Sequence, residues 1–175
     1  MSYYYDNPQA LTDIVQEFAL APLRNPDMLP TILPLIVGGI VIELYFGKHK
    51  QERLGWNTSV GNAVIWVTVG LNLYINETLT VPELYATYIL IGLGVFVGYM
   101  DFFHKWSEAV AFTVSSAGVV YTLAYILVVF VMTDLNPVDE TTLYGAGLFF
   151  IITIIVFKVL QGLETDQDRN RFGNI

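Results

Sequence analysis

Long apolar runs separated by short polar stretches dominate the pattern of this 175-residue chain. Five runs stand out, at residues 29–46, 60–75, 84–100, 109–132 and 143–160. A helix needs about 17 to 25 apolar residues to cross the hydrocarbon core of a bilayer, and each run comes close to that length. The pattern therefore predicts an all-α, polytopic membrane protein with five transmembrane helices.

The residues before the first run show a different pattern. Between residues 8 and 21, apolar side chains recur at helical spacing while acidic and amide side chains occupy the other face. Asn7 and Pro8 form the cap and first-turn pair that often begins a helix. We therefore expect an N-terminal amphipathic helix. Because its polar face is acidic, docking on the protein's own outer loops or on a partner is as reasonable as lying on anionic lipid.

Basic residues fall on alternate connections between the runs. The first loop, the third loop and the C-terminal end contain Lys48, Lys50, Arg53, Lys105, Lys158, Arg169 and Arg171. Arg24 is the single base in the N-terminal tail, and the second and fourth loops have none. Since positive charge near a span resists translocation, this distribution predicts an N-terminus outside the cell membrane and a cytoplasmic C-terminus.

This topology divides the chain into three parts. They are an extracytoplasmic tail at residues 1–28, a five-helix transmembrane domain at 29–163 and a cytoplasmic tail at 164–175. The outer segments contain nine acidic residues and one base, so the formal net charge of −8 lies on the outer face. One interpretation is an electrostatic funnel for cations. The simpler one is ordinary loop-charge asymmetry in an acidic proteome.

Two ionisable residues fall inside the apolar runs. An ionisable side chain in hydrocarbon is unfavourable by several kcal/mol and persists only with a partner or a function. Glu43 in the first run, Lys158 in the last and the polar Asn62 in the second are expected at similar depth, so we predict an intramembrane cluster of the three. It would suit a coupling proton or a cation. Alternatively, Lys158 reaches the water and Glu43 faces the bases of the first loop.

Small residues in the third and fourth runs are typical of helix packing in lipid, where close backbone approach drives association. The residues expected at such contacts are Gly94, Gly98, Ser115 and Gly118. A solute path lined by hydroxyl groups along the fourth helix is the alternative. Tyr121 and Tyr125 at mid-depth would then suit an apolar or a cationic ligand.

One segment resembles a metal site. Asp101, His104 and Glu108 are spaced by three and four residues, which places them on one face of a continuous helix. Lys105 shares that face, and aromatic residues occupy the opposite one. These features favour an interfacial anchor over metal binding.

The function classes that remain are few. The chain has no cysteine, which removes disulfides and thiolate chemistry, and it has no nucleotide-binding, hydrolase or zinc-protease motif. No cofactor and no nucleic-acid partner are expected. The sequence favours a non-catalytic membrane subunit, scaffold or oligomer-forming component, with the lipid bilayer and other copies or other membrane subunits as partners. The alternative is a small ion or solute channel or transporter.

Overall fold

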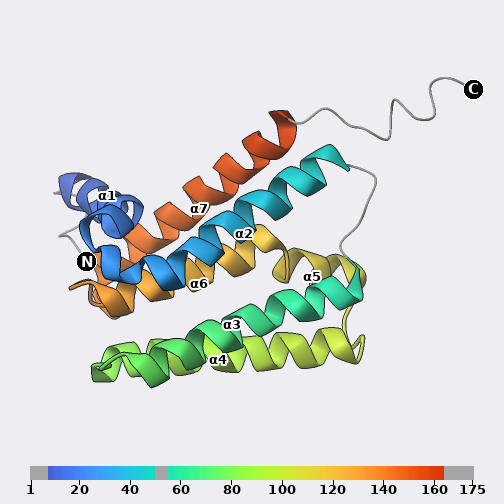
Figure 1. Cartoon of the computed structure of the whole chain (residues 1–175), viewed down its shortest axis with the longest axis horizontal. Coiled ribbons are helices and arrows are strands. Elements are labelled where there is room, and N and C mark those ends of the chain that lie inside the picture. The colour runs from blue at the N-terminus through green and yellow to red at the C-terminus, as the bar shows by residue number, and fades with distance from the viewer. Residues whose placement is uncertain (1–7, 50–54, 164–175) are drawn as a thin grey trace, which may run out of the picture.

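The computed structural model describes residues 8–49 and 55–163, and every regular element in these two ranges is a helix (Figure 1). In chain order the elements are α1 (Pro8–Arg24), the 3-10 turn η1 (Pro26–Met28), α2 (Leu29–Lys48), α3 (Trp56–Asn76), α4 (Val81–Phe102), α5 (Glu108–Val114), α6 (Ala117–Met132) and α7 (Glu140–Leu163). The expected cap at Asn7, the loop bases Lys50 and Arg53 and the tail at 164–175 lie outside the described residues.

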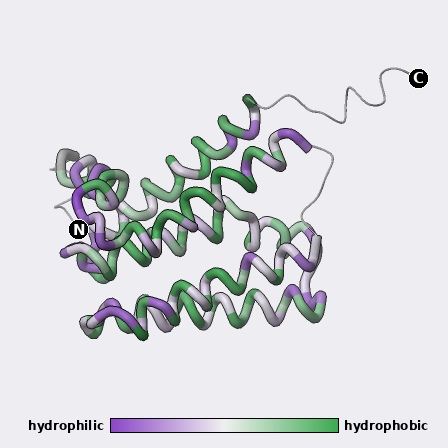
Figure 2. The backbone as a smooth tube through the Cα atoms, in the orientation of Figure 1, coloured by the Kyte–Doolittle hydropathy of each residue, from purple (hydrophilic) through white to green (hydrophobic). Residues whose placement is uncertain are grey.

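Five segments are long and apolar enough to cross a membrane. They are Pro26–Lys48, Trp56–Asn76, Val81–Phe102, Glu108–Met132 and Glu140–Leu163. Figure 2 shows that hydrophilic residues gather toward the two ends of the bundle. Many large apolar side chains on the long helices are exposed. In water such exposed apolar surface would be unfavourable, whereas in lipid it is the expected exterior. The predicted all-α fold with five membrane-spanning segments is confirmed.

Helix α6 forms the centre of the bundle. Of the span that contains it, 67% is buried inside the protein, against 11% for α7. Helices α2 and α7 pack on one side of α6, and the α3–α4 hairpin packs on the other (Figure 1). Every side chain from Ala124 to Phe130 is buried. The sequence of α6 is apolar all round because neighbouring helices cover it on every side.

Helix α1 packs on the protein itself, against α7 and α6, at the end of the bundle where α2 begins (Figure 1). Phe18 is fully buried there. Its ring meets the Phe130 ring edge-on, with centroids 5.4 Å apart, and stacks on the Phe149 ring at 5.3 Å. The Tyr125 hydroxyl donates a hydrogen bond to the Phe18 carbonyl at 2.7 Å. The apolar face of α1 therefore completes the core at this end.

Glycine allows α3 and α4 to approach closely. A Cβ added at Gly94 would lie 2.8 Å from Val67 Cγ2 and 3.0 Å from the Ala63 carbonyl oxygen, closer than real side chains permit. At Gly98 the nearest atom would be Ala63 Cβ at 3.6 Å, an ordinary contact. Only the first of the two glycines is therefore required by the packing of this hairpin.

The expected helical face through Asp101, His104 and Glu108 is wrong, because α4 ends two residues before His104 and α5 begins at Glu108. His104 has a positive φ of 49°. The Lys105 N–H bonds to the Met100 carbonyl at 2.8 Å, and the His104 N–H bonds to the Asp101 carbonyl at 3.1 Å. This pair of bonds is the Schellman motif that closes many helices. Glycine usually occupies the left-handed position, and the lack of a glycine here removed the usual sign of a helix end.

Candidate functional site

The fourth span is broken inside the bundle. Helix α5 ends at Val114 and α6 begins at Ala117, and Ser116 between them has an extended ψ of 148°. Two adjacent serines favour such a break because their hydroxyl groups compete with the helix for backbone hydrogen bonds. A break at this depth leaves backbone groups that water cannot reach, so the protein must supply their partners.

One side chain of α3 supplies such a partner, and a second bonds to a carbonyl within α6. The Asn62 side-chain amide donates to the Ser115 carbonyl at 2.8 Å, and the Trp66 indole N–H donates to the Val120 carbonyl at 2.9 Å. Both side chains are buried. The Asn62 bond replaces the helical bond that the Ser115 carbonyl would accept in an unbroken span.

The Asp101 carboxylate joins α4 to the same break. One of its oxygens accepts hydrogen bonds from the Ser59 hydroxyl at 2.5 Å and from the Ser115 hydroxyl at 2.6 Å. The other accepts from the Trp106 indole N–H at 2.6 Å. Asp101 is fully buried, and three donors from three segments satisfy it. These four residues, named here the Asp101 cluster, hold the broken span in place.

Glu43 lies on the opposite side of the break and lines a cavity of about 410 Å³. Its side chain is 5% exposed, and the cavity walls come from α2, the α5–α6 junction and α7. A Cβ added at Gly118, in the first turn of α6, would lie 3.1 Å from Glu43 Oε1. The carboxylate therefore lies over the N-terminal turn of α6, whose partial positive charge favours an anion.

Gln161 connects Glu43 to Lys158. The Gln161 side-chain amide donates to Glu43 Oε2, and the exposed Lys158 ammonium donates to Gln161 Oε1 at 3.1 Å. Arg24 and Glu17 form the one ion pair found within residues 8–49 and 55–163. The buried Glu43 carboxylate thus has an amide as its partner. The Lys158 ammonium lies at the rim of the cavity and bonds to that amide, not to the carboxylate.

The three residues expected in one intramembrane cluster occupy two places. Glu43 and Lys158 line the same cavity, whereas Asn62 contacts the other side of the break. Sequence analysis missed Gln161. Its position three residues after Lys158 puts both side chains on the same face of α7, which is the signal that would have found it. Ser115 and Gly118, expected at packing contacts, both lie at the break.

The structure does not bring the three possible metal ligands together. The Asp101 oxygens are occupied by their own cluster, and His104 is exposed and stacked on Trp56, with ring centroids 4.1 Å apart. Glu108 is exposed in the first turn of α5. Across the part of the chain that the structure describes, no group of three or more His, Cys, Asp or Glu residues is arranged to hold a metal ion.

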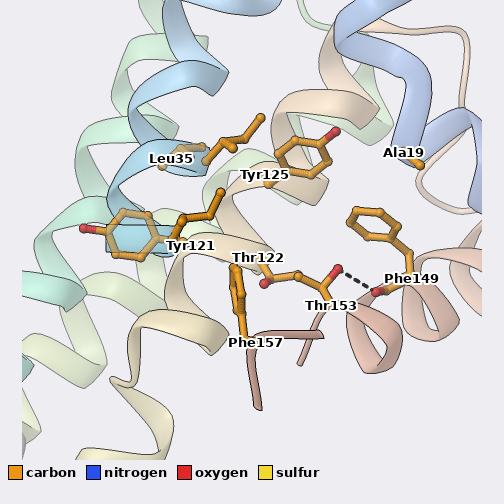
Figure 3. Close-up of a pocket in the computed structure, with 10 residues that line it drawn as sticks. Ala19, Leu35, Tyr121, Thr122, Tyr125, Phe149, Thr153 and Phe157 are labelled. Atoms are coloured by element: carbon orange, nitrogen blue, oxygen red, sulfur yellow. Dashed lines mark hydrogen bonds between the residues drawn. The ribbon is translucent and has the colours of Figure 1, made fainter. Parts of the chain in front are cut away.

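A second, apolar cavity of about 260 Å³ lies further along α2, α6 and α7 (Figure 3). Tyr121, Tyr125, Phe149 and Phe157 form its aromatic walls. Thr122 also lines it; this side chain is 3% exposed, and its hydroxyl has no hydrogen-bond partner among the described residues. An unpaired buried hydroxyl is unusual, because most buried polar groups have a hydrogen-bond partner.

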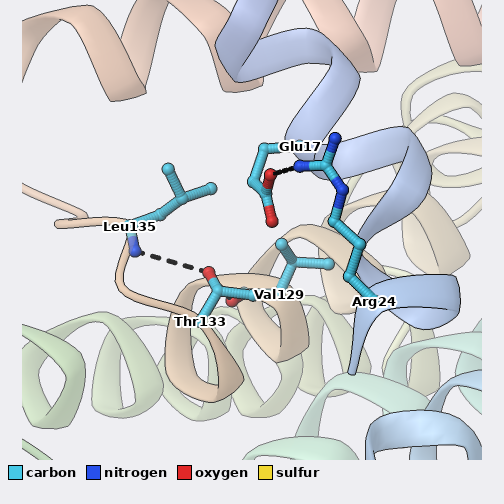
Figure 4. A network of polar contacts seen from close by, with 5 residues as sticks. All are labelled: Glu17, Arg24, Val129, Thr133 and Leu135. Carbon is cyan, nitrogen blue, oxygen red and sulfur yellow. Dashed lines mark hydrogen bonds and ion pairs between the residues drawn. The ribbon is translucent and has the colours of Figure 1, made fainter. Parts of the chain in front are cut away.

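The end of the bundle near α1 contains a wider, polar cleft of about 920 Å³. Figure 4 shows part of its wall, where Glu17 pairs with Arg24 and the Leu135 N–H donates to the Thr133 hydroxyl at 3.4 Å. The carboxylates that line the cleft are Glu17, Asp27, Glu77, Glu83 and Asp134. With one guanidinium among five carboxylates, the cleft has a negative potential that attracts cations.

Fold and site together define an all-α membrane protein with five spanning segments, one of them broken beside a buried carboxylate. Comparison of the chain with protein-family models, curated proteins and solved structures gave no match.

Proposed function

We propose that this protein is a small membrane transporter for cations and that the Glu43 carboxylate is the group that binds them. The observation that carries the proposal is a 5% exposed carboxylate that faces a cavity of about 410 Å³ beside a broken span. A buried ionisable group within a membrane indicates a transport or coupling site when it has no ionic partner. Discontinuous helices are a common source of such sites in transporters.

The charge distribution also supports a cationic substrate. The cleft with five carboxylates lies at the opposite end of the spans from Glu43, and negative potential there raises the local concentration of cations. Helix α6 is tightly packed, and the cleft and the cavity at Glu43 share no lining residue. Transport on this proposal therefore requires a change of conformation, and the break between α5 and α6 is the point where the central span can bend.

We propose the orientation that the basic loops predict, with the acidic cleft outside a cell membrane and Glu43 near the cytoplasm. The chain has no native cysteine, so a single introduced thiol is diagnostic. Val138→Cys and Phe103→Cys alter exposed residues in two different loops. An impermeant maleimide should label the first in intact cells and the second only after permeabilisation. Labelling of the Phe103→Cys protein alone in intact cells would show that the protein has the opposite orientation.

Ion exchange in proteoliposomes tests the transport proposal. Vesicles with an imposed pH gradient and an internal pH dye would receive Na⁺, K⁺ or one of a series of quaternary ammonium ions. The wild-type protein should dissipate the gradient with at least one of these cations, and Glu43→Gln should reduce the rate at least tenfold. Glu140→Gln makes the same change at an exposed position and should leave the rate unchanged.

The alternative is the function that the sequence alone favours, a non-catalytic membrane subunit, scaffold or oligomer-forming component. Equal dissipation rates in protein-free and protein-containing vesicles for every cation would overturn the transport proposal in its favour. So would full activity of the Glu43→Gln protein, because the proposal assigns the bound charge to that carboxylate.

A further inference from the structure

Phe157 of α7 lines both the cavity at Glu43 and the apolar cavity beyond it. Its ring lies above two glycines from neighbouring helices. Added Cβ atoms at Gly39 of α2 and at Gly118 of α6 would each lie 3.4 Å from the ring. The Phe157 ring thus packs directly on the backbones of α2 and α6, between the two cavities.

The same glycine places a carboxylate and an aromatic ring around one point. The position that a Cβ of Gly118 would take is 3.1 Å from Glu43 Oε1 and 3.4 Å from Phe157 Cδ2. Both residues line the adjoining cavity, so a cationic group bound in that cavity can contact the carboxylate and the ring at once. Attraction to the face of an aromatic ring adds to the ionic attraction, and it is strongest where water is excluded.

The rest of the lining does not suit an inorganic ion. Small divalent ions need several oxygen ligands. Monovalent inorganic ions also bind best where a ring of oxygens replaces their hydration shell. This cavity offers a single carboxylate, with Thr113, Ser116 and Gln161 as its other side-chain oxygens. Four phenylalanines from three helices form much of its wall: Phe46, Phe112, Phe150 and Phe157. Apolar walls with one charged group instead fit a ligand with a charged end and an apolar body.

We infer that the site takes an organic ammonium ion with an apolar or aromatic body. The ammonium group binds between Glu43 and the Phe157 ring, and the body lies against the phenylalanine side chains. This inference rests on the proposed function, because it names the class of cation that the transporter carries. Lys158 at the rim opposes a bound cation, and Gln161 keeps its ammonium away from the carboxylate.

Titration calorimetry on the full chain in detergent tests the inference with three probes. Benzyltrimethylammonium has both the charge and the aromatic body, tetramethylammonium has the charge alone, and benzenesulfonate has the ring with the opposite charge. We expect benzyltrimethylammonium to bind at least fivefold more tightly than tetramethylammonium, and benzenesulfonate to give no heat above that of empty micelles. Equal binding of the two cations, or binding of the sulfonate, would overturn the inference.

Variants with opposite expected effects exclude a general loss of folding. Glu43→Gln should weaken benzyltrimethylammonium binding at least tenfold, and Phe157→Leu should weaken it about three- to thirtyfold, the range that one cation–π contact provides. Lys158→Gln should instead tighten binding about threefold, because it removes the opposing charge. The exposed Glu140→Gln control should leave binding unchanged. Weaker binding by the Lys158→Gln protein would contradict the proposed arrangement.

The two proposals fail in different ways. Selective binding of benzyltrimethylammonium without any ion exchange in vesicles would support the site and overturn transport. Exchange of Na⁺ or K⁺ that depends on Glu43, with no binding of benzyltrimethylammonium, would support transport and overturn the organic ammonium ion as substrate.

Discussion

The Asp101 cluster makes a sharp prediction about stability. Replacing Asp101 with leucine removes the acceptor for the Ser59 hydroxyl, the Ser115 hydroxyl and the Trp106 indole N–H. Each buried donor left without a partner reduces stability by about 1–3 kcal/mol. Serine hydroxyl groups can turn toward nearby backbone carbonyls, but the indole N–H cannot. We therefore expect Asp101→Leu to lower the free energy of unfolding by about 3–6 kcal/mol.

Asp101→Asn is the informative comparison, because it preserves the shape of the side chain. The amide oxygen can still accept from Trp106, and the two amide hydrogens can donate to the hydroxyl groups of Ser59 and Ser115 once these rotate. We expect a loss of about 1–2 kcal/mol, well below that of the leucine variant. Thr87→Val serves as a buried control. The Thr87 hydroxyl has no partner within the described residues, so its removal should be neutral or stabilising by about 1 kcal/mol.

Unfolding of the purified protein by sodium dodecyl sulfate in mixed micelles, followed by far-ultraviolet circular dichroism, measures these differences. The predicted order of stability is Thr87→Val at or above wild type, then Asp101→Asn, then Asp101→Leu. Equal losses for the asparagine and leucine variants would refute the reasoning, because they would show that charge, and not the number of hydrogen bonds at this position, makes Asp101 necessary.

Two further predictions concern single positions. Gly94→Ala should destabilise the α3–α4 hairpin by about 1–3 kcal/mol, because its Cβ would lie 2.8 Å from Val67 Cγ2 and 3.0 Å from the Ala63 carbonyl oxygen. Gly98→Ala should change stability by less than about 0.5 kcal/mol, because its Cβ would make only an ordinary contact. Unfolding midpoints in detergent measure both changes, and equal losses would contradict the prediction. The Thr142 backbone N–H, which donates to Asp139 at 3.0 Å, holds the pKa of that carboxyl below its ordinary value of 3.8. The ionised Asp139 therefore stabilises the start of α7 at pH values above about 4, and this stabilisation is lost as the pH falls through its lowered pKa. Asp139→Asn should reduce the acid sensitivity of unfolding. An unchanged dependence of unfolding on pH would contradict the assignment.

The number and extent of the spans could be predicted from the sequence because each crossing of the hydrocarbon core requires a long run of apolar residues. Each expected run lies inside, or within a residue or two of, a helical segment. The two departures both concern backbone termination. Helix α4 stops through a left-handed His104, and the fourth span breaks at two serines without a proline or a glycine between its parts. The first ending places a non-glycine residue in the left-handed conformation, and the second is stabilised by a tertiary hydrogen bond from Asn62, so residue propensities indicated neither.

The candidate site was predictable only in part, for the same reason. Glu43 and Lys158 could be singled out because ionisable residues in apolar runs are rare. Their separation by Gln161 could not, because it depends on how α2 and α7 meet. Asn62 was expected beside them by depth alone, yet it lies on the other side of the break. Depth along a span follows from the sequence, whereas rotation about the helix axis follows from packing.

The break between α5 and α6 explains why two buried acids in one small protein have different surroundings. Asp101 faces a side of the break where α3 and α4 provide three donors, and a carboxylate with that many bonds has little to offer a ligand. Glu43 faces the other side, where the partner is one amide and the neighbouring space is empty. A side chain such as leucine at residue 43 would fill part of that space and stabilise the bundle through packing. The protein instead keeps a carboxylate there, at a stability cost that binding a cation would offset.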